Sequence, residues 1–175
     1  MKNIVELTEV NREDLPSIYC DMDQVLVNLF KGAEKVLGYP LDQYKTPEQK
    51  QDRWKRINAV KGFWENLEWM PNAKKMYQSI TRYDAKILSA YTNKDPNSRQ
   101  GKMKWLSKNT NFKRKDIHLV LRSQKQNYAV SDGKPNVLID DHPKNIREWE
   151  SKGGIGVHHT SVSKTMGELK RLGFK

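Results

Sequence analysis

The chain has 175 residues, of which 32 are Lys or Arg and 21 are Asp or Glu, so its formal net charge is +11. This length suits one domain with a small insertion, and the single Cys20 excludes an internal disulfide framework. No run approaches the roughly 20 apolar residues of a membrane-spanning helix, and residues 1–10 lack the apolar core of a signal peptide. We therefore expect a soluble, cytoplasmic, globular protein with no membrane partner.

The positive charge is spread along the chain, and only short clusters such as residues 113–115 stand out. This pattern is typical of a solvated surface. It is also compatible with a polyanionic partner, either a nucleic acid or a small phosphorylated substrate.

Five short apolar runs predict strands that are covered on both faces. They are residues 18–20, 85–88, 117–121, 137–139 and 154–157. Helical patterns between and after these runs cover residues 29–37, a segment that begins at Pro47, and residues 73–80, 99–108, 143–151 and 162–172. Strands that alternate with helices predict a three-layer α/β domain around a central parallel sheet.

The interval between the first two strands, residues 21–84, is longer than one crossover helix requires. Thr46, Pro47 and Gln49 indicate a capping box at the start of a helix within this interval, and Asn72 is a candidate cap for the helix after it. We therefore expect a core domain of residues 1–28 and 72–175, with residues 29–71 inserted as a small helical cap over one edge of the sheet.

Acidic and hydroxyl side chains follow three of the predicted strands. Asp21 and Asp23 come after the first strand, Ser89 after the second, and Asp140 and Asp141 after the fourth. Because ligands of open parallel sheets bind beyond the carboxyl ends of the strands, these residues are expected to form one site. Crowded carboxylates repel one another, and a hard divalent cation such as Mg²⁺ would neutralise them.

Residues 21–26 read Asp-Met-Asp-Gln-Val-Leu, which resembles the first motif of the haloacid dehalogenase (HAD) phosphohydrolase superfamily. Ser89 resembles the second motif, a downstream Lys the third, and Asp140-Asp141 the fourth, over roughly residues 17–160. Within that superfamily, residues 21–26, the helical segment after the first strand, and residues 63–67 and 138–141 are most similar to the 5'(3')-deoxyribonucleotidases.

The resemblance implies an Mg²⁺-dependent phosphomonoesterase that acts on deoxyribo- or ribonucleoside monophosphates. Asp21 would attack phosphorus and form an aspartyl-phosphate, and Asp23 would protonate the leaving alcohol and later activate water. Asp21, the backbone carbonyl of Asp23, and Asp140 or Asp141 would hold the metal. Ser89 and the third-motif Lys would bind phosphate oxygens.

The lysine of the third motif has several candidates. Lys125 follows the third strand and is our choice, and Lys134, nearer the fourth strand, is the alternative. Lys102 lies on a predicted helix, where we expect it to be solvated.

Aromatic residues could supply a wall for a nucleobase. Phe30, Phe63 and Trp64 are the candidates, and packing of the cap onto the core is the alternative role for Phe63 and Trp64. Two residues depart from the family pattern. Gln24 replaces the usual Gly, which predicts an altered or strained backbone, and Asn28 stands where many relatives have Asp.

Two other functions remain open at this point. A polynucleotide 3'-phosphatase would share the Asp-x-Asp pattern, the Ile-Asp-Asp sequence at residues 139–141 and a downstream Trp at position 149, and the positive charge favours it. A catalytically weak nucleotide-binding module would account for Gln24. The base, the sugar position of the phosphate and the oligomeric state also stay open.

Overall fold

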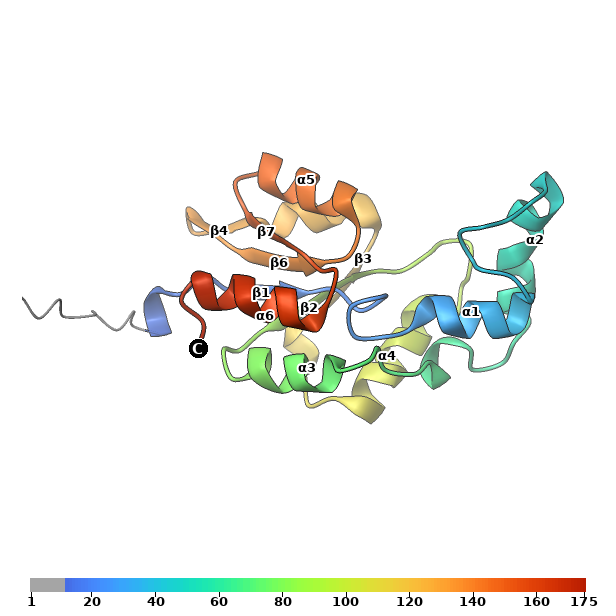
Figure 1. Ribbon diagram of the computed structural model, residues 1–175, viewed down its shortest axis with the longest axis horizontal. Coiled ribbons are helices and arrows are strands. Elements are labelled where there is room, and N and C mark those ends of the chain that lie inside the picture. Colours follow the sequence, from blue (N-terminus) through green and yellow to red (C-terminus); the bar gives the residue numbers. More distant parts are fainter. Residues whose placement is uncertain (1–11) are drawn as a thin grey trace, which may run out of the picture.

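The computed structural model describes residues 12–175, and its centre is a five-stranded parallel sheet of order β3-β2-β1-β6-β7 (Figure 1). The strands are β1 (Ile18–Cys20), β2 (Lys86–Ala90), β3 (Ile117–Val120), β6 (Val137–Asp140) and β7 (Ile155–His158). The five predicted strands are therefore confirmed. Residues 1–11, which we assigned to the core domain from the sequence, lie outside the described residues.

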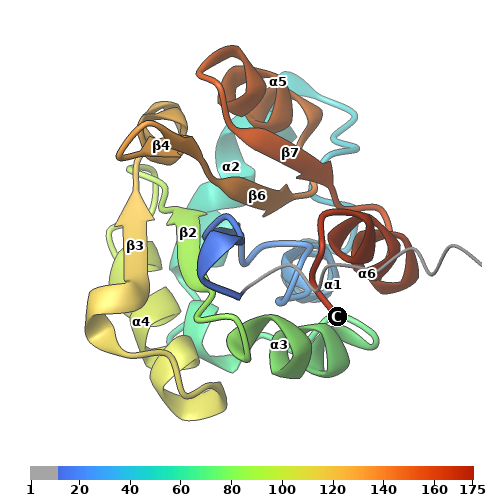
Figure 2. The same ribbon diagram turned by 90° about the vertical axis from the view of Figure 1, so that its left-hand side faces the viewer.

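Helices cover both faces of this sheet (Figure 2). One face carries α3 (Ala73–Thr81), α4 (Ser98–Asn109) and α6 (Val162–Arg171), and the other carries α5 (Pro143–Ser151) and the 3₁₀ helix η4 (Arg122–Tyr128). The expected three-layer α/β class is confirmed. None of the helices within residues 12–175 is long and apolar enough to cross a membrane.

The central strand β1 is apolar at every position because both of its faces are covered. Ile18 and Cys20 are fully buried in the larger apolar cluster, whereas Tyr19 between them belongs to the smaller cluster under α5. Successive side chains of a strand point to opposite faces, so a strand covered on both sides needs an apolar residue at every position. A short run without alternation is the expected signature of such a strand.

The segment that follows β1 contains α1 (Leu29–Leu37), α2 (Pro47–Asn58) and the 3₁₀ turn η2 (Trp64–Asn66). Thr46 caps α2 by accepting a hydrogen bond from the Gln49 amide, as the sequence predicts. The Gln49 side chain returns to the Lys45 amide instead of the Thr46 amide, so the capping box is incomplete. Asn72 occupies the predicted N-cap position of α3, but it adopts a left-handed conformation and its side chain makes no cap hydrogen bond.

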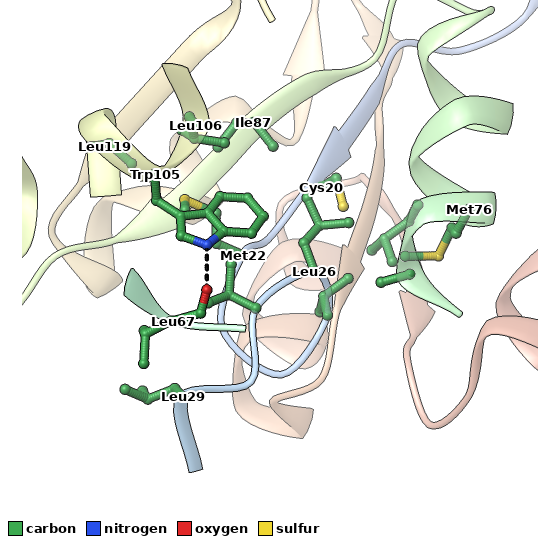
Figure 3. Packing of buried hydrophobic residues seen from close by; sticks show 14 of the residues in the cluster. Cys20, Met22, Leu26, Leu29, Leu67, Met76, Ile87, Trp105, Leu106 and Leu119 are labelled. Carbon is green, nitrogen blue, oxygen red and sulfur yellow. Dashed lines mark hydrogen bonds between the residues drawn. The ribbon is translucent and has the colours of Figure 1, made fainter. Parts of the chain in front are cut away.

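The helix α4 packs against this segment and against the core. Trp105 is fully buried and its Nε1 donates a hydrogen bond of 2.8 Å to the Leu67 carbonyl, just beyond η2 (Figure 3). One turn earlier, Gly101 lies so close to Trp64 that a Cβ atom on it would be 2.4 Å from the Trp64 Cβ. Gly101 therefore sets how closely α4 approaches η2.

Two glycine-to-alanine variants should change stability in opposite directions. Gly101→Ala should lower the free energy of unfolding by about 1–3 kcal/mol, because the new methyl group overlaps Trp64 near its backbone. Gly167→Ala should raise it by about 0.5–1 kcal/mol, because Gly167 is inside α6 with open space around it. Urea unfolding of both variants measures this difference, and equal shifts would contradict the packing argument.

The sequence analysis missed the 3₁₀ helix η4 and the hairpin that follows it. The helix η4 has the polar sequence Arg-Ser-Gln-Lys-Gln-Asn-Tyr, which has no apolar periodicity, and it carries Lys125. It leads into a two-stranded antiparallel hairpin of β4 (Val130–Ser131) and β5 (Lys134–Pro135). Both hairpin strands are exposed, so Lys134 lies on the surface.

Candidate active site

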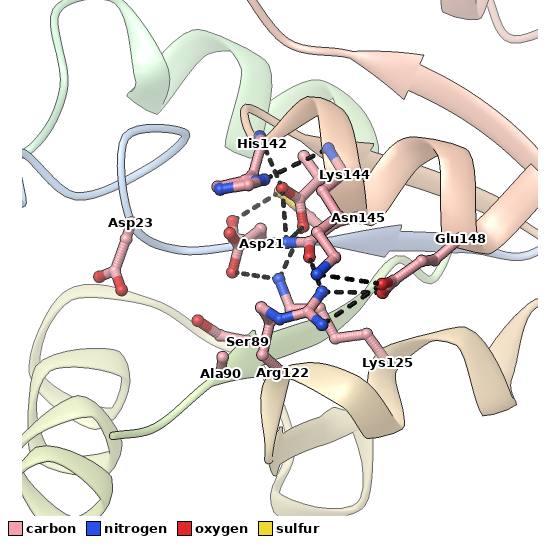
Figure 4. Close-up of polar contacts among 12 residues, drawn as sticks. Asp21, Asp23, Ser89, Ala90, Arg122, Lys125, His142, Lys144, Asn145 and Glu148 are labelled. Atoms are coloured by element: carbon pink, nitrogen blue, oxygen red, sulfur yellow. Dashed lines mark hydrogen bonds and ion pairs between the residues drawn. The ribbon is translucent and has the colours of Figure 1, made fainter. Parts of the chain in front are cut away.

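The candidate site lies at the carboxyl edge of the sheet, around the end of β1 (Figure 4). Asp21 follows β1 directly, Ser89 belongs to β2, and Asp140 is the last residue of β6. Because β1 is hydrogen-bonded to β2 on one side and to β6 on the other, the three side chains come from neighbouring strands. The chain order reverses at β1, which is where open α/β sheets form their binding crevice.

Lys125 joins the first and fourth motifs. Its Nζ lies 3.0 Å from Asp21 Oδ1 and 2.7 Å from Asp140 Oδ2, and the side chain is 3% exposed. Burial opposes the charge of Lys125, but Asp21 and Asp140 outweigh it and raise the pKa of Lys125 above its ordinary value. The ammonium group is thus charged and fixed between two carboxylates, whereas Lys134 is exposed on the hairpin.

Lys102 is also part of this edge, so the prediction of a solvated helix residue is wrong. Its side chain is 2% exposed, and its Nζ lies 2.6 Å from Asp23 Oδ2 and donates a hydrogen bond of 3.1 Å to Ser89 Oγ. A third hydrogen bond goes to the Ala90 carbonyl. The polar sequence of α4 hides this role, because only the packing of α4 against η2 brings Lys102 over the end of β2.

Asp140 is held by hydrogen bonds from α5. The His142 amide donates to its Oδ1 at 2.8 Å, and Asn145 Nδ2 lies 3.1 and 3.0 Å from its two oxygens. Arg122 donates to Asn145 Oδ1 and is itself paired with Glu148 at 2.7 Å. The sequence analysis missed Asn145 and Arg122. The one available signal was a polar pair, Asn145 and Glu148, one turn apart on a helix that begins at the fourth motif.

Three carboxylates at this edge could hold a cation. Oxygen atoms of Asp21, Asp140 and Asp141 all lie within 4.8 Å of one another. Asp21 Oδ1 is buried, and the Lys125 ammonium lies 3.0 Å from it. Burial, followed by the charges of Asp21 and Asp140, raises the pKa of Asp141 to about 7. Crowded oxygen ligands with a free lone pair fit Mg²⁺, and its binding would relieve their repulsion.

Asp23 is outside this carboxylate group and faces Lys102 instead. Burial raises the pKa of Asp23 above its ordinary value, although the Lys102 ammonium acts in the opposite direction. Its Oδ1 is buried and accepts no hydrogen bond. A carboxyl group in this environment can hold a proton more readily than an exposed aspartate does.

The loop between β1 and α1 accounts for the two departures from the family pattern. Gln24 adopts a left-handed backbone conformation with φ of 59°, where Gly is ordinarily favoured. Its Oε1 accepts a hydrogen bond of 3.0 Å from the Phe30 amide, and Asn28 Oδ1 accepts one of 3.2 Å from the Lys31 amide. Both side chains thus satisfy amides at the start of α1, which offsets part of the conformational cost at Gln24.

The three candidate aromatic residues have different environments. Phe30 is 39% exposed, whereas Phe63 and Trp64 are 7% and 4% exposed. Trp64 packs edge-on against Phe63 and donates a hydrogen bond from Nε1 to Asp95. Packing of Trp64 against Phe63 and Gly101 accounts for their burial, and contact of all three aromatic residues with a base stays a prediction.

The sheet is parallel and Rossmann-like, and its carboxyl edge carries Asp21, Asp23, Ser89, Lys125 and Asp140. This arrangement has the features of the HAD class of phosphohydrolases. The model of the family described as "5' nucleotidase, deoxy (Pyrimidine), cytosolic type C protein" matches residues 15–171. The chain therefore belongs to this family and is a HAD-type phosphatase of the nucleotidase kind.

Solved structures support the fold. A hydrolase from Streptococcus pneumoniae TIGR4 is 10% identical, with a TM-score of 0.56 over 89% of this chain and 98% of the other. A dehalogenase is 11% identical, with a TM-score of 0.54 over 93% of this chain and 99% of the other. At these identities the likeness concerns the fold alone. No curated protein sequence matches the chain.

Proposed function

We propose that the protein is an Mg²⁺-dependent nucleotidase that releases phosphate from deoxyribo- or ribonucleoside monophosphates through an aspartyl-phosphate on Asp21. The observation that carries this proposal is the environment of the Asp21 carboxylate. Its Oδ1 is buried and lies 3.0 Å from the Lys125 ammonium, and an oxygen of Asp21 lies within 4.8 Å of oxygens of two further carboxylates. A buried carboxylate oxygen next to a fixed cation is suited to nucleophilic attack on phosphorus.

The reaction divides into two displacements at phosphorus. In the first, an Asp21 oxygen forms the bond to phosphorus while the bond to the nucleoside oxygen breaks, and Asp23 donates a proton to that leaving oxygen. In the second, Asp23 takes a proton from water, whose oxygen attacks phosphorus and releases Asp21 as a carboxylate. The raised pKa of Asp23 supports this exchange of one proton between the two steps.

Two side chains would bind the phosphate oxygens. Lys125 presents its ammonium beside Asp21, and Ser89 keeps its hydroxyl proton available because its oxygen accepts from Lys102. Asp21, Asp140 and Asp141, with the backbone carbonyl of Asp23, would hold Mg²⁺. When bound, the cation would supply charge stabilisation for the phosphate oxygens in the transition state. Lys125 and Lys102 also hold the catalytic carboxylates in place before substrate binds.

The inserted segment, residues 29–71, is proposed to act as a cap. Its helix α1 begins next to the first motif, and Phe30 on its first turn is partly exposed. A half-exposed aromatic ring at this position can contact a base, and such stacking contributes about 1–3 kcal/mol. Phe30→Ala should therefore raise KM for a nucleoside monophosphate about tenfold with little change in kcat. Steady-state kinetics measure the split, and an unchanged KM would exclude this contact.

A phosphate-release panel tests the proposed function. The substrates are deoxyribo- and ribonucleoside 5'- and 3'-monophosphates and a 3'-phosphorylated oligonucleotide, each with Mg²⁺ and with EDTA. We expect release from monophosphates in Mg²⁺ alone. Release from the oligonucleotide alone would favour an end-processing phosphatase, and a folded protein that releases nothing would refute the enzyme and leave a binding module.

The affinity for Mg²⁺ should rise with pH. Because the pKa of Asp141 is about 7 without metal, this carboxyl is largely protonated at about pH 6 and ionised at about pH 8. A cation binds the ionised form, so its affinity should be about tenfold higher at the upper pH. Without metal, the raised pKa favours the folded state at low pH, and this contribution is lost as the pH rises through about 7.

Thermal unfolding with and without Mg²⁺ at both pH values measures this effect. The Mg²⁺-induced rise in Tm should be larger at about pH 8, and Asp141→Asn should reduce the pH dependence. A rise in Tm that is the same at both pH values would contradict a titrating Asp141 at the metal site.

A further inference from the structure

A cation-lined groove lies outside the candidate active site, between α2 and the loop that follows β2. Its volume is about 800 Å³, and its lining includes Lys50, Lys55, Lys94, Gln51, Asn58 and Trp54. The three lysines are exposed, and no lining residue of this groove is acidic. Asn58 Nδ2 donates a hydrogen bond of 2.6 Å to the Lys94 carbonyl, which ties the two walls together. In Figure 1, the loop from β2 runs outward to meet α2.

Aromatic rings are interleaved with these cations. Trp54 contributes its ring to the groove and stacks on Trp64, with centroids 6.4 Å apart and planes 9° from parallel. Tyr44 lies beside the groove lining and is 37% exposed, and its ring is 5.5 Å from Lys50 Nζ and 4.9 Å from the Arg53 guanidinium. Ring faces beside cations are the combination that binds unpaired bases together with their phosphates.

The charge around the groove also favours a polyanion. Residues 45–61 contain six Lys or Arg side chains and two acidic ones, Glu48 and Asp52. Neither acidic residue lines the groove. A nucleoside monophosphate carries one phosphate group, which the candidate active site would hold. Lysines distributed over α2 and the opposite loop instead suit a ligand with several phosphates in a row.

The groove is physically connected to the candidate active site. Trp64 stacks on Trp54 on the groove side, and the Nζ of Lys102 lies 5.4 Å from the Trp64 ring centre. The same ammonium holds Asp23 at 2.6 Å. The Trp64 ring and the Lys102 ammonium therefore link Trp54 of the groove to a proposed catalytic carboxylate.

We propose that this groove binds single-stranded nucleic acid, with bases against Trp54 and backbone phosphates against Lys50, Lys55 and Lys94. This interaction goes beyond the hydrolysis of mononucleotides and does not depend on it. A strand held here would extend along α2, beside the carboxyl edge of the sheet. Duplex DNA has its bases already stacked and cannot offer them to Trp54, so the groove should prefer the single strand.

The test is fluorescence anisotropy with a short fluorescein-labelled oligothymidylate that carries no terminal phosphate, in EDTA. The absence of phosphate and metal separates this binding from catalysis. The groove variant combines Lys50→Gln, Lys55→Gln and Lys94→Gln. Its matched control changes three exposed lysines away from α2, namely Lys113→Gln, Lys115→Gln and Lys170→Gln. Both variants lose the same charge.

We expect the groove variant to weaken binding at least about tenfold and the control variant less than about threefold. The slope of log Kd against log salt should fall by about 2 for the groove variant, since each phosphate contact to a single strand contributes about 0.7. Equal losses in the two variants would mean diffuse charge attraction and would overturn the proposal. No binding by the wild-type chain at low salt would overturn it too.

A second comparison tests the aromatic contact. Trp54→Leu should weaken binding about fivefold or more, whereas Trp54→Phe, which keeps a ring, should retain most of the affinity. Far-UV circular dichroism checks that both variants fold. An unlabelled duplex of the same length should compete less well than the unlabelled single strand. If the duplex competes equally, or if the Leu and Phe variants bind alike, the groove is not a single-strand site.

Discussion

Asp21→Asn should reduce phosphate release from a nucleoside monophosphate by at least about a thousandfold, because the amide is a poor nucleophile and removes a ligand of the proposed metal. The loss should appear in kcat with a smaller change in KM, since Ser89 and Lys125 still bind the phosphate. Release of inorganic phosphate, followed in parallel for wild type and variant from the same preparation, measures this effect. The variant also controls for contaminating phosphatase.

The structure indicates that this variant should remain folded. Lys125 keeps its ion pair of 2.7 Å with Asp140, and an amide at position 21 is nearly the same size as the carboxyl. Brief reaction with radiolabelled phosphate donor and acid quenching should trap a phosphoenzyme from wild type and none from Asp21→Asn. Activity within about tenfold of wild type in this variant would show that Asp21 is not the nucleophile.

Lys125→Met should lower the free energy of unfolding of the metal-free protein by about 3–5 kcal/mol, because it leaves two buried carboxylates without their cation. Asp21 and Asp140 both lose the ion pairs that Lys125 makes, at 3.0 and 2.7 Å. Met fills nearly the same volume, so the effect is electrostatic and not a cavity. Urea unfolding in EDTA measures it.

The matched control is Lys134→Met, which removes the same charge from the exposed strand β5. This change should alter stability by less than about 0.5 kcal/mol. Mg²⁺ should recover part of the stability lost in Lys125→Met, because the cation would neutralise the same carboxylates. Similar unfolding curves for Lys125→Met and Lys134→Met would contradict the buried ion-pair network, whatever their activities.

Several features of the site could be predicted from local sequence because each depends on one strand and its end. A buried parallel strand is a short apolar run, and its carboxyl end is the next polar residue. Asp21, Ser89 and Asp140 follow this rule, and their meeting at one edge follows from the parallel order of the strands. Lys125, our choice for the third-motif lysine from its position after β3, lies beside Asp21 and Asp140, and its role in binding phosphate stays a prediction.

Other features depend on how elements pack, and no local pattern reveals packing. Lys102 reads as one more cation on a polar helix, and it is buried because Gly101 and Trp105 bring α4 against η2 and residue 67. Arg122 reads as a loop residue, and it supports Asp140 only because η4 lies beside α5.

The sequence by itself therefore determined the α/β class, the strands, and the carboxylates that follow β1 and β6. The tertiary structure decided which cations pair with those carboxylates: Lys125 pairs with Asp21 and Asp140, and Lys102 pairs with Asp23. It placed Arg122 against Asn145 and Glu148. It also placed Trp54 and Lys94 in one groove, although 40 positions separate them in the chain. The physical reason is that apolar periodicity depends on residues that are neighbours in the chain. Burial of a charge depends instead on partners that other helices and strands supply.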